Sequence, residues 1–544
     1  MSEVKTRSGL TGAGFTVTGS GRGWANSMRI RLVEPRPPGR TVYDYAMLPR
    51  LGLPLIATLL ARAGHDVKVY CELLAPVDLE ECLTADIVGI STTTSTAPAA
   101  YRLADLLASA GVPVVLGGPH ASFRTEEGLD HAPFVVRGEG QATMLELLEC
   151  LSVGGDLGSV PGLSLLRADG ERCHNPARPM TSQADFVALP APDLSFLVGH
   201  EKMVTKPVMT QWGCPFDCEF CSVTAMFSRS VRHRSTEHVV QEIAAMGAER
   251  VFFYDDNFVV KKARTAELLE AMVATGLTPP WFAQLRADAV LSAQGRPELD
   301  HSFLDLMRRA GAQMVMIGFE AITDEALASL GKRLSVATEE RAVAALHKHG
   351  IAVHGMFVAG LDTDDVSSAV ATARFARRLG IDTFQLMAET PLPGTKLWDR
   401  ASAEGRLLSE DWSLFDGHQV VMRPALMSPL DLQLGILEAT RRFYSWPGII
   451  RSGLAGALSH LPTLVGTTGP AVVRQLPALA KMAVARRWDE VTPFLEEKLP
   501  SPSFSGLVQA FWLPATRMYA RRQLSAWWAA GRSRAHLELL RSLA

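Results

Sequence analysis

The stretch "QWGCPFDCEFCSV" at Gln211–Val223 places three cysteines, Cys214, Cys218 and Cys221, within eight residues. The chain of 544 residues has seven cysteines in all, so nearly half of them lie in this one segment. Thiols gathered so closely are typical of metal ligands, whereas disulfide frameworks are typical of small secreted domains. The apolar runs around the cluster indicate which fold presents it.

Six apolar segments alternate with helix-like segments after about residue 204, and the cysteine cluster follows the first of them. The strands are expected near 204–210, 250–254, 281–286, 313–319, 352–358 and 382–387. Repeated βα units fit a partial (β/α)6 barrel better than a second flat sheet. In barrels the chemistry lies at the carboxyl ends of the strands, so we expect the site there.

An earlier series of Val- and Ile-rich runs predicts a separate α/β domain. Its strands are expected at 28–35, 66–72, 85–92, 112–118 and 132–140. Continuous apolar strands with amphipathic segments between them predict a doubly wound, Rossmann-like parallel sheet. The expected organisation is a disordered extension (1–27), this domain (28–150), a linker with a hairpin (151–200), the barrel (201–430) and a mostly helical C-terminal region (431–544).

The composition narrows the class of protein. A net charge of −3 gives no reason to expect nucleic acid as a partner. Residues 1–27 are polar and lack the apolar core of a secretory signal, so we expect a reducing cytoplasm. Residues 451–544 carry 12 Lys and Arg against 5 Asp and Glu. A basic helical cap is the favoured interpretation, and contact with a membrane surface or a lipid-like substrate is the alternative.

Three clustered thiols without a fourth suit an iron–sulfur cluster. Four thiolates saturate a 4Fe–4S cluster, so three leave one iron open to a substrate or cofactor. The alternative is a zinc site completed by His233 or His238, because zinc takes four ligands. The spacing C-x3-C-x2-C directly after a strand favours the cluster.

With these features the chain resembles the radical S-adenosylmethionine (SAM) superfamily. The resemblance implies that Cys214, Cys218 and Cys221 hold the cluster and that SAM chelates the open iron. One electron then cleaves SAM to methionine and a 5′-deoxyadenosyl radical. Phe220, before the last cysteine, is expected against the adenine.

Further SAM-binding candidates stand at the ends of later strands, where the family has its binding residues. "FYDDNF" departs from the family's Gly-Gly-Glu, and its acidic pair is expected to accept from the SAM amine. "LRAD" supplies a cation for the SAM carboxylate or the substrate, and "IGFE" an acceptor for the ribose. The candidates are Asp255, Asp256, Asn257, Gln284, Arg286 and Glu320.

The first domain resembles that of the cobalamin-binding radical SAM enzymes. The likeness lies in "PRLGLPLIATLLARAGHDVKVY" (49–70), "VVLGGPHAS" (114–122) and "VVRGEG" (135–140). It extends to "DWSLFDGHQVVMRP" (411–424), in the segment after the barrel. It implies a cobalamin whose tail enters the sheet. The expected cobalamin-binding residues are Ser91, Thr92, Thr93, Thr94, Gly117, Gly118, Pro119, His120, Gly138, Glu139 and Gly140.

One motif of many cobalamin proteins is missing from the sequence. D-x-H-x-x-G, whose histidine ligates cobalt from below, does not occur, and in this radical SAM class that histidine is commonly absent. His120 is an alternative ligand, although an ordinary loop histidine is the favoured interpretation. A domain that keeps the fold without cobalamin is a further alternative.

The resemblance implies a cobalamin-dependent radical SAM methyltransferase acting on an unactivated carbon, or a phosphinate phosphorus, of a small biosynthetic substrate. The methyl group would pass from one SAM to cobalt and then to a substrate radical made with a second SAM. The substrate is expected between the two domains, and the electron donor is expected to be a flavodoxin or ferredoxin. The alternatives are a cyclase or rearrangement enzyme, and a non-radical corrinoid-binding module.

Overall fold

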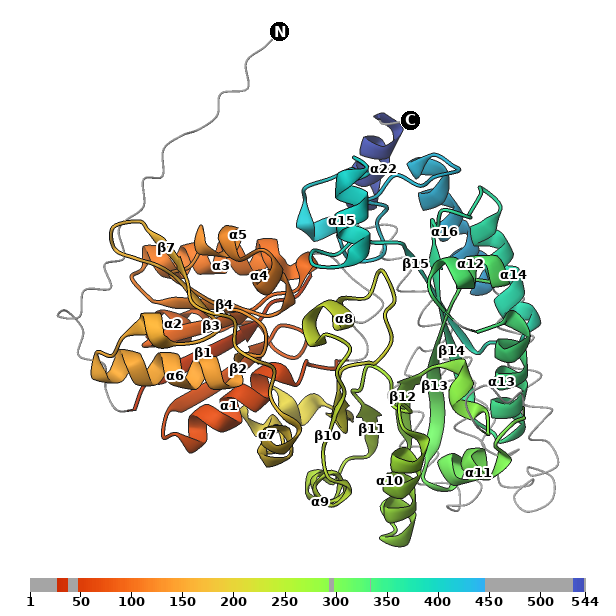
Figure 1. Ribbon diagram of the computed structural model, residues 1–544, viewed down its shortest axis with the longest axis horizontal. Helices are drawn as coiled ribbons and strands as arrows, with labels where there is room; N and C mark the ends of the chain where they lie inside the picture. The colour runs from red at the N-terminus through yellow and green to blue at the C-terminus, as the bar shows by residue number, and fades with distance from the viewer. Residues whose placement is uncertain (1–26, 38–46, 293–297, 333, 446–531, 543–544) are drawn as a thin grey trace, which may run out of the picture.

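The computed structural model describes residues 27–37, 47–292, 298–332, 334–445 and 532–542 (Figure 1). The predicted N-terminal extension lies almost entirely outside these residues. So does most of the C-terminal region, including the basic stretch and its alternative role at a membrane. Among the described residues, no helix is both long and apolar enough to cross a membrane.

The first domain is built on a seven-stranded sheet in the order β2-β1-β3-β4-β5-β6-β7. Strands β1 to β5 pair in parallel, as predicted. The strand order reverses between β1 and β3, so the loops that leave these two strands run to opposite sides of the sheet. Parallel sheets bind ligands in the crevice that this reversal opens at the carboxyl ends of the strands. The bounds are β1 Arg29–Glu34, β2 Asp66–Cys71, β3 Ile87–Ser91, β4 Val114–Gly117 and β5 Phe134–Val136, with α1 Gly52–Arg62, α2 Leu79–Leu83, α3 Ala97–Ser109, α4 Pro119–Phe123, α5 Thr125–Leu129 and α6 Gly140–Val153.

The predicted hairpin belongs to this sheet, so the boundary at residue 150 and the linker interpretation need correction. Strands β6 (Leu163–Leu166) and β7 (Arg172–His174) add to β5 in antiparallel fashion. Phe186 in α7 (Gln183–Ala188) and Leu197 are each 1% exposed and pack into the core of the domain. The sequence did not reveal that this segment belongs to the first domain, because single apolar residues in a Pro-rich stretch show no helix or strand periodicity.

The second sheet holds six parallel strands in chain order, β8-β11-β12-β13-β14-β15. The two end strands, β8 and β15, do not pair with one another, so the barrel is partial. The six predicted strands are confirmed. Their bounds are β8 Thr205–Val208, β11 Arg250–Phe253, β12 Trp281–Leu285, β13 Ala312–Glu320, β14 Ala352–Ala359 and β15 Thr383–Ala388. The helices are α8 Ser222–Phe227, α9 Thr236–Met246, α10 Lys262–Ala274, α11 His301–Arg309, α12 Asp324–Ser329, α13 Val336–Lys348, α14 Ser368–Arg378, α15 Lys396–Ala403 and α16 Pro429–Phe443, with α22 Arg532–Ser542 against α16.

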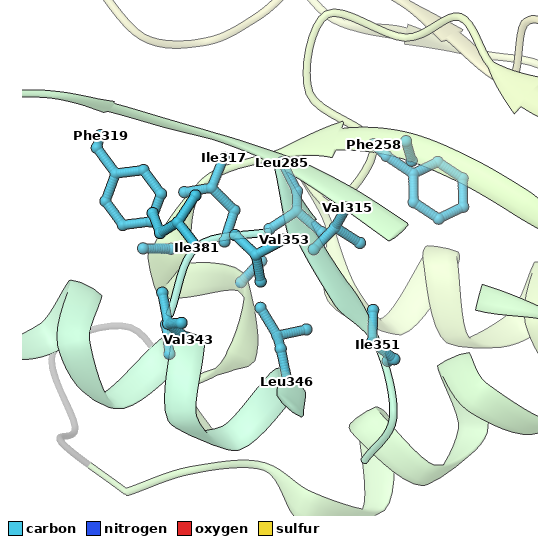
Figure 2. Close-up of a cluster of buried hydrophobic side chains, with 14 of the residues drawn as sticks. Phe258, Leu285, Val315, Ile317, Phe319, Val343, Leu346, Ile351, Val353 and Ile381 are labelled. Carbon is cyan, nitrogen blue, oxygen red and sulfur yellow. The ribbon is translucent and has the colours of Figure 1, made fainter. Parts of the chain in front are cut away.

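The barrel core lies between the strands and the outer helices. Figure 2 shows Val315, Ile317 and Val353 of the strands packed toward Val343 and Leu346 of α13. Since neighbouring residues of a strand point to opposite faces, the alternate residues face the barrel interior. That interior set includes Gln284, Met316, His354, Met356 and Met387, all of them half-buried.

Candidate functional site

The three cysteines lie on the loop between the short strand β9 (Gln211–Trp212) and α8, at the carboxyl end of β8. The Cys221 N–H donates to the Cys218 carbonyl oxygen over 3.1 Å, which folds the loop back on itself. Burial raises the pKa of Cys214 and Cys218, and raises that of Cys221 to about 11. The free thiols therefore keep their protons, and binding of iron has to release them.

The cysteine loop is anchored by α15, which follows the last barrel strand. Lys396 Nζ lies 2.8 Å from Asp217 Oδ2, and Arg400 Nε donates to Glu219 Oε1 over 3.1 Å. The Leu397 N–H donates to the Glu219 carbonyl oxygen at 3.2 Å. The acidic residues between the cysteines thus fix the loop to the barrel. Sequence analysis missed this anchor because its partners are about 180 residues apart.

The first carboxylate of the acidic pair is structural. Asp255 is 1% exposed, and its Oδ1 accepts from the Thr210 N–H at 2.7 Å and the Gln211 N–H at 3.1 Å, while its Oδ2 accepts from the Thr210 hydroxyl. Burial raises its pKa to about 7, against the effect of these donors. Asp255 therefore joins β11 to the start of the cysteine loop. Three of its acceptor positions are used in this way, so Asp255 has a structural role whether or not it also contacts the SAM amine.

The second carboxylate lies beside the cluster cysteines. Displacement of water by the surrounding protein raises the pKa of Asp256 to about 6. The hydrogen bond from the Gly213 N–H acts in the opposite direction, because it stabilises the ionised carboxylate. The charge of Asp256 in turn contributes to raising the pKa of Cys214 and Cys221, which shows how near it lies. Asn257 follows with its Oδ1 buried and without a hydrogen-bond partner. Asp256 and Asn257 thus offer the free acceptors at this strand end.

Arg286 and Gln284 extend along β12 toward the same place. The Arg286 guanidinium lies 3.8 Å from the ring centre of Phe216, on the cysteine loop, and also pairs with Asp288 at 3.2 Å. The positive charge of Arg286 offsets part of the rise that burial causes in the pKa of Cys214 and Cys218. The side chain of Gln284 faces the interior two residues before Arg286. A cation so close to the thiols suits a carboxylate ligand or the negative charge of a cluster.

Glu320 ends β13 in an unusual conformation. Its φ is +65°, and the register between β13 and β14 shifts between Gly318 and Glu320. Lys332, 6% exposed, donates to the Gly318 carbonyl oxygen and lies 3.2 Å from Glu320 Oε1. Lys332 was not predicted, because a lysine after a short helix carries no motif. It holds the strand end that carries the predicted ribose acceptor.

A buried carboxylate adjoins this ion pair. Glu339 of α13 is fully buried, both of its oxygens lack a hydrogen bond, and burial raises its pKa to about 8 despite the charge of Lys332. Phe220 lies nearby, packed partly against Ala321, Leu327 and Leu361 beyond the ends of β13 and β14. The predicted cluster and SAM-binding residues therefore gather at one mouth of the barrel.

The predicted cobalamin loops meet at the carboxyl edge of the first sheet. Thr92 Oγ1 donates to the Gly117 carbonyl oxygen at 2.9 Å and accepts from the Ala121 N–H at 3.0 Å, so it joins two loops. Gly118 has φ +90°, and a Cβ there would lie 2.6 Å from the Thr92 carbonyl oxygen. Such close backbone approach is possible because Gly118 has no side chain, and small residues line this edge of the sheet. Thr93 and Thr96 form a capping box at the start of the next helical turn. Gly138 is exposed, and the half-buried residues of the edge are Ser91, Thr93, Gly117, Gly118, Pro119, Glu139 and Gly140.

Two of the predicted cobalamin residues are used elsewhere. The His120 ring is buried, 5.0 Å from the Trp412 ring and 6.1 Å from the Tyr101 ring, so it faces the second domain. Glu139 pairs with Arg232 and accepts from the Thr181 N–H at 2.8 Å. These contacts remove both side chains from the open edge.

The residues around the thiols suit an iron–sulfur cluster. Within the described parts of the chain, no three His, Cys, Asp or Glu side chains are arranged to hold one ion, the three cysteines with His233 or His238 included. Three thiols on one loop, next to free acceptors and a cation, fit a 4Fe–4S cluster with SAM on its open iron. The small-residue edge of the first sheet fits a corrinoid. Fold and site together define a radical SAM protein with a corrinoid-binding domain.

The comparisons with known proteins agree with this class. The model of the B12 binding domain matches residues 44–148, and that of the radical SAM superfamily matches residues 208–399. An uncharacterised methyltransferase of Pyrococcus horikoshii is 30% identical over 74% of this chain and 89% of its own length. The bacteriochlorophyllide d C-12(1)-methyltransferase of Chlorobaculum tepidum is 28% identical over 77% and 88%. The hopanoid C-3 methylase of Methylococcus capsulatus is 28% identical over 74% and 78%.

Solved structures share the fold at lower identity. The cobalamin-dependent SAM radical enzyme OxsB with aqua-cobalamin has a TM-score of 0.61 at 16% identity, covering 94% of this chain and 83% of that one. The radical SAM methyltransferase TsrM of Kitasatospora setae, with cobalamin and a 4Fe–4S cluster, has a TM-score of 0.58 at 19% identity, covering 69% and 78%.

The chain belongs to the radical SAM superfamily, in the group whose members carry an N-terminal B12-binding domain. It is a radical SAM enzyme of the methyltransferase kind, and its cofactors are a 4Fe–4S cluster, SAM and cobalamin. The alternatives of a lost cobalamin and of a non-radical carrier are left without support.

Proposed function

We propose that this enzyme transfers a methyl group to an unactivated carbon of a large, mostly apolar ring compound, held at the barrel mouth between the two domains. One observation carries the placement. Phe123, at the end of the helix that follows the Gly117–Gly118 loop, packs against Gly394 in the loop after β15. The cobalamin edge and the cysteine loop therefore open toward the same mouth.

When bound, the cluster and SAM supply a radical that removes hydrogen, and cobalamin supplies the methyl group. The residues of the chain bind and orient these groups. Asp256 and Asn257 accept from the SAM amine, Arg286 neutralises the SAM carboxylate, and Glu320 accepts from the ribose. Phe220 presents an apolar face to the adenine.

The barrel interior supports the substrate class. Met316, Met356 and Met387 face inward, and thioether side chains adapt to flat or irregular apolar surfaces. His354 is a polar residue among these methionines, and its Nδ1 lies 2.8 Å from Thr383 Oγ1. Burial lowers the pKa of His354, which favours the neutral ring. Relatives named for hopanoid and bacteriochlorophyllide methylation agree with a polycyclic substrate.

The experiment uses anaerobically reconstituted enzyme with cobalamin, a strong reductant and SAM that carries a trideuterated methyl group. A hopanoid and a chlorophyllide serve as probes. Mass spectrometry should find a trideuteromethyl group in place of hydrogen on one of the ring systems. If neither ring system acquires the labelled methyl group, the apolar substrate class is wrong.

A cyclisation without methyl transfer is the second candidate, because an anaerobic magnesium-protoporphyrin IX monomethyl ester cyclase of Rubrivivax gelatinosus is 27% identical over 77% of each chain. Methylation yields S-adenosylhomocysteine together with 5′-deoxyadenosine, whereas cyclisation yields 5′-deoxyadenosine alone. Quantifying both by chromatography separates the two. A flavodoxin or ferredoxin as electron donor, and a reducing cytoplasm, belong to the proposal in either case.

A further inference from the structure

The two domains are joined by an aromatic contact centred on Trp412, to which no role has been assigned above. The short helix η7 (Trp412–Leu414) follows the barrel and lies against η2 (Thr94–Thr96) and α3 of the first domain. The Trp412 Nε1–H donates to Glu127 Oε1 over 2.7 Å. The Arg124 guanidinium lies 5.3 Å from the centre of the same indole, and the His120 ring meets it edge-on at 5.0 Å.

These partners continue directly from the predicted cobalamin loops. Helix α4 begins at Pro119, next to Gly117–Gly118, and η2 begins at Thr94, next to Ser91–Thr93. Phe123 completes the contact, because a Cβ on Gly394 would come within 2.3 Å of its ring. Only glycine lets the loop after β15 approach so closely.

The opposite side of the contact leads to the cysteine loop. The Trp412 ring lies 5.4 Å from the Trp398 ring on α15. The same helix carries Lys396 and Arg400, which hold Asp217 and Glu219 between the cysteines. Figure 1 shows α15 beside α4 at the junction of the two domains. Trp412 therefore links α15, which holds the cysteine loop, to the surroundings of the cobalamin edge.

The central acceptor of this contact is charged. Burial opposes the ionised form of Glu127. The nearby His120 ring and the hydrogen bonds from Arg124 and Trp412 outweigh burial and lower its pKa to about 2. Hydrogen bonds to an ionised acceptor are stronger than neutral ones, so the Trp412–Glu127 bond resists exchange for water.

We propose that α15 and η7 form an interdomain bracket, with Trp412 as a positioning residue that fixes the distance between the cobalamin and the SAM on the cluster. The inference rests on the proposed function, because methyl transfer between the two cofactors is what requires that distance. A displacement of about 1 Å at a reacting centre can cost a factor of about 100 in rate. Cleavage of bound SAM would take place within the barrel and would not need the contact of Trp412 with the first domain.

The test compares Trp412→Ala and Trp412→Phe with Glu126→Gln in reconstituted enzyme. Glu126 is the matched control, since it precedes Glu127 but is exposed and pairs with Arg172 inside the first domain. Three quantities are measured: bound iron and cobalt, 5′-deoxyadenosine formed in the absence of substrate, and the trideuteromethyl group transferred from SAM to the corrinoid. Hydrogen exchange of residues 119–129 and 396–403 is followed in parallel.

For Trp412→Ala we expect methylation of the corrinoid to fall at least about tenfold, while 5′-deoxyadenosine formation stays within about twofold of wild type. Exchange should rise in both segments, Trp412→Phe should be intermediate, and Glu126→Gln should match wild type. Unchanged exchange and methylation in Trp412→Ala would overturn the bracket. So would equal losses of methylation and 5′-deoxyadenosine, which indicate general damage. If wild-type enzyme itself fails to methylate the corrinoid, the proposed function fails, and the exchange data still decide whether the contact holds the domains together.

Discussion

Asp255 and Asp256 follow β11 as consecutive carboxylates, yet the groups around them differ. The first accepts three hydrogen bonds from Thr210 and Gln211, and the second lies beside Cys214 and Cys221. The sequence predicted an acidic pair at a strand end but not which member was free, because hydrogen bonding to a neighbouring loop leaves no trace in composition.

We therefore expect Asp255→Asn and Asp256→Asn to act on different properties. In Asp255→Asn the introduced amide would face backbone donors, so the free energy of unfolding should fall by about 2 kcal/mol. Asp256→Asn should leave stability within about 0.5 kcal/mol of wild type and weaken SAM binding about tenfold, through loss of a charged acceptor. Denaturant unfolding and calorimetric titration with SAM measure the two effects. The reverse pattern would exchange the two roles.

Buried carboxylates also set the response of the cofactor-free protein to pH. Glu389 is 7% exposed, and burial, helped by the charge of Asp362, raises its pKa to about 8. The folded state thus holds a proton that the unfolded chain releases near pH 4.5, so stability should fall as pH rises from about 4.5 to about 8.

Glu389→Gln should remove part of that slope. Each unit of pKa corresponds to about 1.4 kcal/mol, so the variant should gain up to about 4 kcal/mol over wild type at pH 8 and almost nothing at pH 4.5. Unfolding in denaturant at several pH values measures it. A gain that is equal at both ends would show that ionisation of Glu389 is not the cause.

Among the elements, the strands were the most predictable. All six barrel strands and the five parallel strands of the first sheet follow from apolar runs, since a buried strand must be apolar on both faces. The placement of β6 and β7 was not predictable, because a short half-buried hairpin reads the same whether it stands alone or extends a sheet.

Helix α15 gives a prediction at this scale. Arg400→Gln removes the guanidinium that holds Glu219 at 3.1 Å and Asp362 at 2.6 Å, so the cysteine loop should move more freely. We expect the reconstituted cluster to lose iron to a chelator at least about threefold faster than in wild type, because a looser loop opens the cluster more often.

Arg378→Gln is the matched control, since Arg378 lies on α14 and pairs with Glu340 on the outer surface at 3.3 Å. Loss of cluster absorbance under anaerobic conditions measures the rate. Equal rates in the two variants would mean that α15 does not secure the loop.

At the scale of the whole molecule, the two domains and their cofactors followed from motifs, but their mutual placement did not. Trp412 and Glu127 are 285 residues apart, and neither carries a pattern that announces the other. Contacts between domains depend on single side chains without period. For this reason the cysteine cluster could be predicted from the sequence, while the contact between the domains required the structure.

The measurement that tests the central claim most directly is a single anaerobic assay of reconstituted enzyme with hydroxocobalamin, reductant and trideuteromethyl SAM. The account predicts about four irons and one cobalt per chain, S-adenosylhomocysteine as a product, and the labelled methyl group on the corrinoid. Iron with cobalt but no labelled methyl group would contradict a methyltransferase and favour the cyclase. Zinc without iron would contradict the radical SAM assignment of the site.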